Sequence, residues 1–454
     1  MATATRNRIV GYRSGTGVGR FRETVARGLH TQSGTGDFPA AERTERTFPL
    51  APMESVEVRL QCLAGLAGGL ALSGRDIPAD LREWHAAHAD FLTNRELVAD
   101  IGLVWSPHSA AVYGREQRES LSFAPYRGMV HALVRGHHSF RPVELADDLT
   151  GVPVLVMPQV GAMSDREIET VRAYVVDGGT LVATGETSLY DETGVARSDY
   201  GLAEVFGASV ANAAPHRLDA ITTRVLADFL NAMPGDIGRF KGPATDHSYL
   251  RLEASGHPIL SGFEGTEVIA YGGQLPFGQA LPNSTVVMSF VPPFPSSPID
   301  AVFPEADRTE IPGLVVGEFG AARVIFMPAD LDRRFGIDPI SDHGQLLDNI
   351  LRWACPSAAV RVGGPGAVLS VLYSQQSSLI LHLVNVTGAD NQAGAVDHIL
   401  PVGPIQVQVR LPEGFAPSSM EFRTTGRRES VNIGNGTILF DVENLVDHEL
   451  VVIS

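Results

Sequence analysis

Apolar positions recur with different spacings along this chain of 454 residues, and the change of spacing divides it into regions. Between residues 94 and 355, continuous apolar runs alternate with stretches whose apolar residues recur every three or four positions. Continuous runs are typical of parallel strands buried on both faces, and the second spacing is typical of helices. Strands that alternate with helices pair in parallel through right-handed crossovers. This region is therefore predicted to form an α/β domain with a doubly wound parallel sheet.

The clearest helix of this region has recognisable start and stop signals in the sequence. Ser164-Asp165-Arg166-Glu167 forms a capping box, and Gly178-Gly179 ends the helix. Residues from about 210 to 301 are rich in Pro and Gly and are interpreted as an insertion in the domain. The other predicted elements are strands at Leu97–Trp105, Phe140–Leu145, Pro153–Met157 and Thr180–Ala183, helices at Tyr126–Arg135 and Asp342–Trp353, and a hairpin of Gly313–Phe319 with Ala322–Met327, turned at Gly320.

The pattern changes after Pro356, where helical spacing ends and short alternating runs begin. Turn sequences such as Gly363-Gly364-Pro365-Gly366 and Gly434-Asn435-Gly436 separate these runs. Short strands at regular intervals with Gly, Pro and Asn turns predict an antiparallel β-sandwich over residues 356–454. Its predicted strands are Val368–Tyr373, Ser378–Val384, Ile405–Leu411, Thr437–Val442 and Glu449–Ile453.

The beginning of the chain is less regular. Residues 1–52 show no periodicity and are predicted to be a disordered or irregular tail. Residues 53–93 contain two helical runs, the second from about Ala79 to Leu92. His85 and His88 lie three apart there, but no acidic or thiol ligand accompanies them at a recognisable spacing, so no metal site is predicted.

Composition narrows the classes of partner. The net charge of −17, from 35 basic and 52 acidic residues, argues against a nucleic acid or an anionic membrane as partner. The two cysteines, Cys62 and Cys355, lie in apolar stretches and are predicted to be core residues without a disulfide or zinc site. Residues 1–22 do not resemble a secretory signal, and the longest apolar run is far short of the ~20 residues of a membrane span. The expectation is a cytoplasmic protein without a cofactor.

Several segments, in order along the chain, resemble the non-catalytic half of glycosidases of the family 42 β-galactosidase type and their hypothetical glycosyl hydrolase relatives. The resemblance runs from about Met53 to the C-terminus. It is carried by Trp84–His88, Asp100–Ser106, Val154–Pro158, Asp177–Thr184, Glu186–Asp191, Ser248–Leu252, His257–Gly262, Met327–Arg333 and Leu381–Gly388.

The resemblance implies a definite architecture. Such proteins combine a catalytic (β/α)8 barrel, a flavodoxin-like domain of the class I glutamine amidotransferase type that serves trimerisation, and a small β-sandwich. Residues 94–355 would be the trimerisation domain and 356–454 the sandwich. A barrel takes about 250 residues, so residues 53–93 would match only its last helices. The expected partner is a homo-oligomer, a trimer by this resemblance, with carbohydrate as a possible ligand.

An active amidotransferase needs a cysteine on a sharp turn after a strand, activated by a histidine. The equivalent turn here is Gly185-Glu186-Thr187-Ser188, which has no cysteine. Ser188 is a conceivable substitute nucleophile, but no G-x-S-x-G elbow surrounds it. Amidotransferase activity is therefore not expected.

Glycoside hydrolysis needs two carboxyl groups around a sugar, and the best candidates are Glu186 and Asp191, near the carboxyl end of a predicted parallel strand. Ligands in open α/β sheets sit at such strand ends. Further candidates for the same crevice, or for a subunit interface, are Ser188, Tyr190, Asp330, Asp332 and Arg333. The competing interpretation is that these groups cap helices and pair with arginines in loops.

The resulting hypothesis is a non-catalytic oligomerisation and accessory region of a β-galactosidase-like glycoside hydrolase. Two alternatives stay open: a hydrolase that acts on glycosides through Glu186 and Asp191, and a carbohydrate-binding module centred on the sandwich. The sandwich region has Tyr373 but no tryptophan, whereas sugar platforms usually need exposed aromatic faces.

Overall fold

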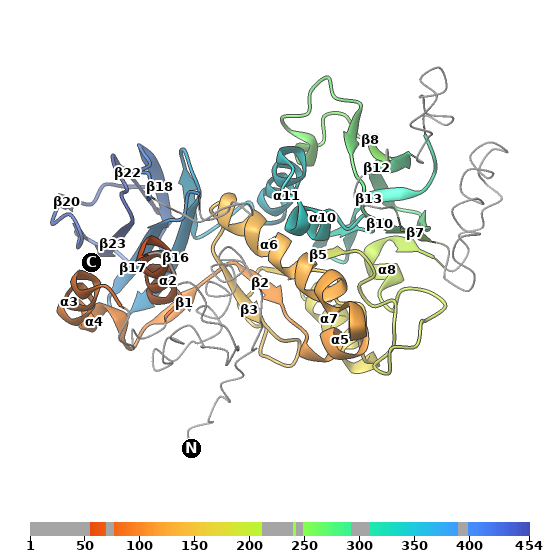
Figure 1. Cartoon of the computed structure of the whole chain (residues 1–454), viewed down its shortest axis with the longest axis horizontal. Coiled ribbons are helices and arrows are strands. Elements are labelled where there is room, and N and C mark those ends of the chain that lie inside the picture. Colours follow the sequence, from red (N-terminus) through yellow and green to blue (C-terminus); the bar gives the residue numbers. More distant parts are fainter. Residues whose placement is uncertain (1–54, 70–76, 211–238, 242–247, 292–307, 389–397) are drawn as a thin grey trace, which may run out of the picture. The chain divides into compact units, whose positions relative to one another are not determined.

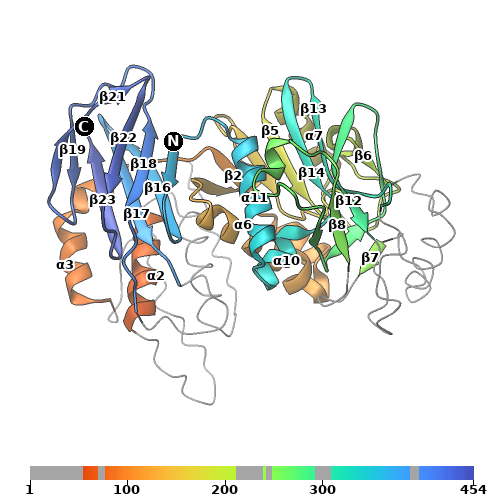
Figure 2. The same ribbon diagram turned by 90° about the horizontal axis from the view of Figure 1, so that it is seen from above.

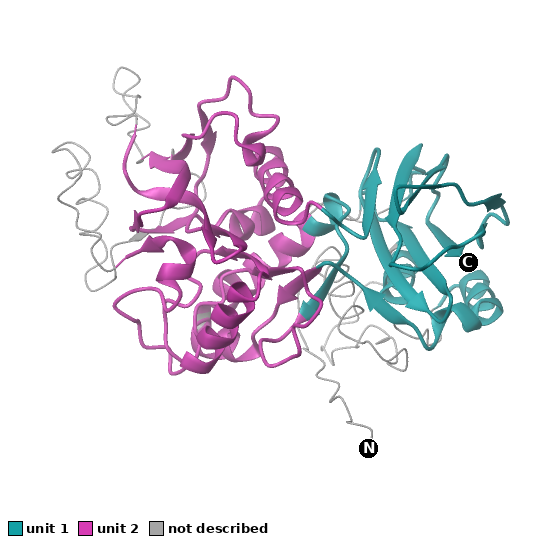
Figure 3. Cartoon of the chain, turned by 180° about the vertical axis from the view of Figure 1, so that it is seen from behind, with its two compact units in different colours: residues 1–100, 133–142, 357–454 teal, residues 101–132, 143–356 magenta. Residues whose placement is uncertain are grey.

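The computed structural model describes residues 55–69, 77–210, 239–241, 248–291, 308–388 and 398–454. The chain divides into two compact units, which Figure 3 shows in different colours. Unit 1 comprises residues 1–100, 133–142 and 357–454, and unit 2 comprises residues 101–132 and 143–356. The predicted tail, residues 1–52, and part of the predicted insertion lie outside the described residues. Within the described ranges, no helix is both long and apolar enough for a membrane span.

Unit 2 is built on a nine-stranded sheet with the order β3-β2-β4-β5-β14-β13-β12-β8-β9 (Figure 1). The pairs β2–β4, β4–β5 and β5–β14 are parallel, and every pair from β14 to β9 is antiparallel. The strands are β2 (Ile101–Val104), β3 (Phe140–Val143), β4 (Val154–Met157), β5 (Thr180–Thr184), β8 (Tyr249–Leu252), β9 (Val268–Ala270), β12 (Ser284–Val291), β13 (Pro312–Phe319) and β14 (Ala322–Met327).

The antiparallel half of the sheet comes partly from the region interpreted as an insertion. β8, β9 and β12 all lie between residues 210 and 301, yet they extend the main sheet. The predicted hairpin of β13 and β14 is confirmed, and Gly320 has the positive φ of 64° that its turn requires. The mixed α/β class is confirmed, and the sheet is not wholly parallel: its strands are parallel from β2 to β14 and antiparallel from β14 to β9.

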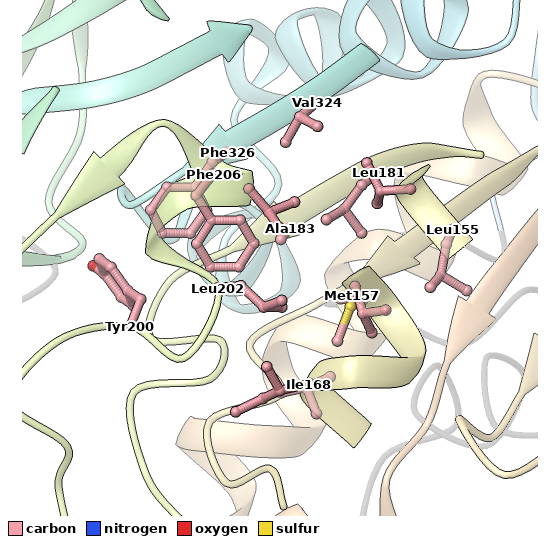
Figure 4. Packing of buried hydrophobic residues seen from close by; sticks show 14 of the residues in the cluster. Leu155, Met157, Ile168, Leu181, Ala183, Tyr200, Leu202, Phe206, Val324 and Phe326 are labelled. Carbon is pink, nitrogen blue, oxygen red and sulfur yellow. The ribbon is translucent and has the colours of Figure 1, made fainter. Parts of the chain in front are cut away.

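Helices cover the sheet because their apolar stripes match its buried faces. α7 (Asp165–Val176) begins at the predicted capping box of Ser164 and Glu167. Together with α8 (Ala203–Phe206) it packs on strands β4, β5 and β14 (Figure 4), where the rings of Phe206 and Phe326 stack with centroids 4.1 Å apart. α11 (Ser341–Ala354) contacts β5 and β14 and packs on α10 (Leu331–Ile337).

The remaining helices of unit 2 are α5 (Pro107–Val112), α6 (Ala124–Arg135), the 3-10 helices η1 (Arg115–Gln117) and η4 (Pro258–Leu260), and the π-helix η2 (Glu119–Phe123). Its remaining strands form two short pairs, β6 (Ala208–Ser209) with β11 (Gln279–Ala280) and β7 (Arg239–Lys241) with β10 (Gln274–Pro276).

Unit 1 contains the predicted sandwich, seen from above in Figure 2. A six-stranded antiparallel sheet of order β1-β16-β17-β23-β19-β20 faces a four-stranded sheet of order β15-β18-β22-β21, with one apolar core from both. The strands are β1 (Glu96–Val98), β15 (Val360–Gly363), β16 (Val368–Gln375), β17 (Ser378–Asn385), β18 (Ile405–Arg410), β19 (Ser419–Phe422), β20 (Arg428–Ser430), β21 (Ile433–Gly434), β22 (Thr437–Val442) and β23 (His448–Ile453).

Three helices precede β1 and belong to the same unit: α2 (Ser55–Ala67), α3 (Ala79–Ala87) and α4 (Ala89–Leu92). α2 contacts β16 and β17 and therefore covers the outer face of the six-stranded sheet. The single helix predicted from Ala79 to Leu92 is interrupted, because His88 leaves the helical conformation with φ −118° and ψ 16°.

The strand predicted from Leu97 to Trp105 is two strands in two different sheets. β1 pairs with β16 of the sandwich, and β2 starts the sheet of unit 2. Asp100 separates them, since its carboxylate turns to accept a hydrogen bond from the backbone N–H of Ala359 at 2.7 Å. The predicted start of the α/β domain at residue 94 therefore falls within unit 1.

Candidate functional site

The carboxyl ends of β4, β5 and β14 lie at one edge of the sheet of unit 2. Met157 is level with Ala183, and Thr184 is level with Met327. The segments that leave these strand ends carry Gln159, Glu186 and the pair Asp330 and Asp332. Parallel pairing therefore brings most of the residues selected from the sequence to the same edge, where open α/β sheets bind ligands.

Glu186 lies in the turn after β5, which begins at Gly185 with a positive φ of 58°. Its side chain is 5% exposed. Oε2 accepts hydrogen bonds from the hydroxyl of Tyr113 at 2.8 Å and from the hydroxyl of Tyr190 at 3.3 Å. The Tyr113 hydroxyl in turn accepts one from Nε2 of Gln159 at 3.1 Å. Two phenols therefore hold the Glu186 carboxylate.

Thr184, the last residue of β5, connects this group to α10. Its hydroxyl accepts from the backbone N–H of Gln159 at 3.0 Å and donates to Oδ2 of Asp332 at 2.5 Å. Asp332 is fully buried, with 0% exposed. Burial raises the pKa of Asp332 to about 7, although the hydrogen bond from Thr184 opposes the shift. Asp332 therefore exchanges its proton near neutral pH.

Asp330 forms a buried ion pair with Arg333 through the Nε atom of the guanidinium. Its other oxygen accepts from the backbone N–H of Gln274 at 2.7 Å and from the hydroxyl of Tyr271 at 3.1 Å. Burial raises the pKa of Asp330, and the charge of Arg333 lowers it. Together these hydrogen-bonded groups form the strand-end network: Tyr113, Gln159, Thr184, Glu186, Tyr190, Tyr271, Asp330, Asp332 and Arg333.

Four residues expected at a crevice or a subunit interface are instead buried within unit 2. They are Ser188, Asp330, Asp332 and Arg333. Ser188 has a positive φ of 64° but is 0% exposed, and its hydroxyl accepts from the backbone N–H of Leu202 at 3.3 Å. The physical reason for the difference is that these polar groups satisfy one another, so they can be buried without an external partner.

Asp191 has a local role in its own loop. Its Oδ1 accepts from the hydroxyl and the backbone N–H of Thr193, at 2.7 and 2.9 Å, and from the backbone N–H of Val195 at 3.0 Å. The hydrogen bond from the Thr193 hydroxyl is the main cause of a lowered pKa of Asp191. This carboxylate closes a turn through bonds within its own loop, and these bonds do not reach Glu186.

Sequence reasoning missed Tyr113, Gln159 and Tyr271, which supply partners to the selected carboxylates. Gln159 had one usable signal, because it directly follows the strand end at Met157-Pro158. His137 and His138 are both buried, and the ring nitrogens of His137 lie 3.0 and 3.2 Å from the carbonyl oxygens of Val362 and Gly366. Among the described residues, no three His, Cys, Asp or Glu side chains form a metal-binding cluster. Cys62 and Cys355 are both buried, as predicted for core residues.

Comparison with known proteins finds similarity at the level of the fold. No protein-family model matches the chain, and no curated protein matches it in sequence. Among solved structures, α-L-fucosidase isoenzyme 2 from Paenibacillus thiaminolyticus aligns over 88% of this chain and 57% of its own, with 16% identity and a TM-score of 0.63. The β-galactosidase from Bacillus circulans sp. alkalophilus aligns over 98% of this chain and 59% of its own, with 11% identity and a TM-score of 0.61.

A third structure, the cold-adapted β-galactosidase from Rahnella sp. R3, aligns over 96% of this chain and 57% of its own, with 10% identity and a TM-score of 0.55. The chain thus spans less than three fifths of the length of these proteins. The resemblance expected from the sequence is therefore supported as a glycoside hydrolase-like fold.

Proposed function

We propose that this chain is a non-catalytic oligomerisation and accessory region of a β-galactosidase-like glycoside hydrolase. The observation that carries the proposal is the strand-end network. Glu186, Asp330 and Asp332 each have their partners inside unit 2. Glycoside hydrolysis requires two carboxyl groups that flank a glycosidic bond. In this chain the carboxyl groups form hydrogen bonds that join the strand ends to one another. Such a role suits a supporting domain.

The strand order supports the more detailed assignment of unit 2. Numbered along the chain, the five strands β3-β2-β4-β5-β14 have the order 2-1-3-4-5, which is the flavodoxin-like order. The turn after the fourth strand is where the amidotransferase nucleophile is expected, and here it carries Glu186. These features favour an amidotransferase-like trimerisation domain that has no amidotransferase chemistry.

The two alternatives have less support. A hydrolase acting through Glu186 and Asp191 needs both carboxyl groups at one sugar, whereas three donors of its own loop surround Asp191. A binding module needs an exposed aromatic platform. Tyr373 of the sandwich is buried, and its hydroxyl donates to the carbonyl oxygen of Ala67 at 2.7 Å.

The oligomeric state of the purified full chain tests the proposal. We expect a trimer of 48.5 kDa protomers in sedimentation velocity and light scattering at micromolar concentration. A monomer at that concentration would contradict the oligomerisation role. Binding of sugars is measured on the same sample by calorimetry against galactosides and fucosides, and saturable binding would move the assignment towards a carbohydrate-binding module.

Turnover of aryl galactosides and aryl fucosides tests the hydrolase alternative. We expect none from the purified full chain. If turnover is measured, its rate is compared between the variants Glu186→Gln and Asp191→Asn, which each remove one of the two candidate carboxylates. Turnover that both variants abolish, with the folded state retained by circular dichroism, would replace the accessory role by a hydrolase.

A further inference from the structure

Unit 1 has a buried cluster of polar rings on the outer face of its six-stranded sheet. His382 of β17 and His448 of β23 lie on neighbouring strands, since His382 pairs with Leu450 and Val384 pairs with His448. Their rings stack with centroids 5.4 Å apart, and both residues are buried. Arg95 completes the cluster from the segment just before β1.

The hydrogen bonds of this cluster have only one possible direction. Nη1 of Arg95 lies 2.6 Å from Nε2 of His382, and a guanidinium can only donate. Nε2 of His382 must therefore be without a proton, which places the ring proton on Nδ1. That Nδ1–H points at Nε2 of His448 at 3.1 Å, so Nε2 of His448 is also an acceptor. Both rings are neutral Nδ1–H tautomers in this arrangement.

The same cluster holds the helices that cover the sheet. Arg95 donates to the carbonyl oxygen of Leu66 at 3.0 Å and lies over the ring of Tyr373 at 3.9 Å. The Tyr373 hydroxyl donates to the carbonyl oxygen of Ala67, so both groups satisfy the last turn of α2. Trp84 of α3 packs on His448 with ring centroids 5.0 Å apart.

Other charged groups surround the cluster. Arg59 of α2 binds Asp447, the residue before β23, and Asp80 of α3, each at 2.6 Å. His88 stacks on Trp84 with centroids 4.4 Å apart, and His85 lies on the same helix. Arg59 and Arg95 are cations, and the anions are Asp447 and Asp80, which Arg59 already binds.

A proton added to either ring removes an acceptor from the chain of hydrogen bonds. On His382 it would point Nε2–H at the guanidinium of Arg95 and place two cations 2.6 Å apart. On His448 it would make Nε2 a donor that faces the Nδ1–H of His382, and the two nitrogens lie only 3.1 Å apart. We propose that His382 and His448 form a proton-sensitive latch that holds α2 and α3 on the sandwich and releases them on acidification. This inference does not depend on the proposed function.

The size of the effect follows from proton linkage. Burial lowers the pKa of His448 to about 4, with Arg59 and Arg95 acting in the same direction and Asp447 against it. A released histidine regains its ordinary pKa of about 6.5. Between pH 7.5 and pH 5, protonation of His448 then favours release about 30-fold. Burial also lowers the pKa of His382, which therefore acts in the same direction.

Hydrogen exchange of the full chain, followed by mass spectrometry, tests the latch. We expect protection factors of peptides from α2 and α3, corrected for the intrinsic pH dependence, to fall at least about 30-fold between pH 7.5 and pH 5. The double variant His382→Gln with His448→Gln keeps an acceptor for Arg95 and a donor between the two positions, but it does not titrate. Its protection factors are expected to change less than about threefold over the same range.

Two single variants serve as controls. His398 is an exposed histidine of unit 1, and His398→Gln should keep the full response. His88→Gln removes the second histidine that packs on Trp84, and it should also keep the full response to pH. Protection that is independent of pH in the unmodified chain, or that falls equally in the double variant, would overturn the latch. If the double variant does not fold, the imidazole nitrogen shifts of the unmodified chain at pH 7.5 decide, because an Nε2–H tautomer at His382 would overturn it.

Discussion

Gly128 of α6 lies directly against the backbone of Asp332 in α10, so that a β-carbon on Gly128 would overlap the carbonyl oxygen of Asp332. One turn further along α10, a β-carbon on Gly336 would lie only 2.3 Å from the carbonyl oxygen of Ala124. Two glycines thus let α6 and α10 cross backbone to backbone. Because Asp332 also binds Thr184, this crossing sets where α10 meets the end of β5.

Gly128→Ala is expected to destabilise unit 2 by about 1–3 kcal/mol or more, since overpacking at a backbone contact forces one helix to move. The substitution improves helix propensity by about 1 kcal/mol, so any measured loss reports the crossing itself. Urea denaturation of the full chain measures it. Gly317→Ala is the matched control, because the nearest atom to its added carbon is 3.8 Å away. Equal stability of the two variants would contradict the close crossing.

Asp332 makes the stability of unit 2 depend on pH in an unusual direction. Its pKa is about 7 in the folded chain and 3.8 when free. Between these values the folded state holds a proton that the unfolded state has released, so stability falls as pH rises from 4 to 7 and then levels off. The shift corresponds to about 4 kcal/mol. Asp330, whose pKa is also raised, acts in the same direction.

The variant Asp332→Asn imitates the protonated acid and should remove most of this slope. We expect the melting temperature of unit 2, from calorimetry between pH 4.5 and 8, to fall with pH in the unmodified chain and to vary much less in the variant. Asp191→Asn, at a partly exposed loop carboxylate, is the comparison. A slope unchanged in Asp332→Asn would show that another group carries the proton.

Local sequence patterns were sufficient for most elements of both units. The capping box at Ser164, the turn at Gly320 and the short alternating runs after Pro356 all depend on neighbours in sequence. The break at Asp100 was not predictable in this way, because the hydrogen bond that ends β1 comes from Ala359. The same limit explains β8 and β9, because β8 is placed by pairing with β12 and β9 by pairing with β8.

The site was predicted in part for the same reason. Parallel pairing implies that the ends of β5 and β14 are neighbours, so Glu186, Asp330 and Asp332 could be grouped from the sequence. The burial of Glu186 and Asp330 could not be foreseen, since it depends on Tyr113 and Tyr271. A tyrosine 73 residues from its carboxylate partner leaves no periodic signal.

Tyr113→Phe tests whether the strand-end network stabilises the fold. The change leaves the Nε2 donor of Gln159 without the Tyr113 oxygen and the Glu186 carboxylate with one phenol fewer. A lost hydrogen bond to a buried charged group costs about 1.5–3 kcal/mol. Tyr190→Phe is the matched control, because its bond to Glu186 is longer, at 3.3 Å, and its ring is only partly buried. Urea denaturation should rank the loss in Tyr113→Phe above that in Tyr190→Phe, and the reverse order would contradict the assigned geometry.

Asp330 and Arg333 form a buried ion pair, and their contributions to the free energy of unfolding should be coupled. Arg333→Met leaves the Asp330 carboxylate buried without its cation, which typically costs about 3–5 kcal/mol. Adding Asp330→Asn removes the orphaned charge while keeping an acceptor for the backbone N–H of Gln274. The double variant is therefore expected to be more stable than Arg333→Met alone, and a double-mutant cycle by urea denaturation measures the coupling. Additive losses would mean that Arg333 stabilises unit 2 through packing of its side chain and not through the charge of Asp330.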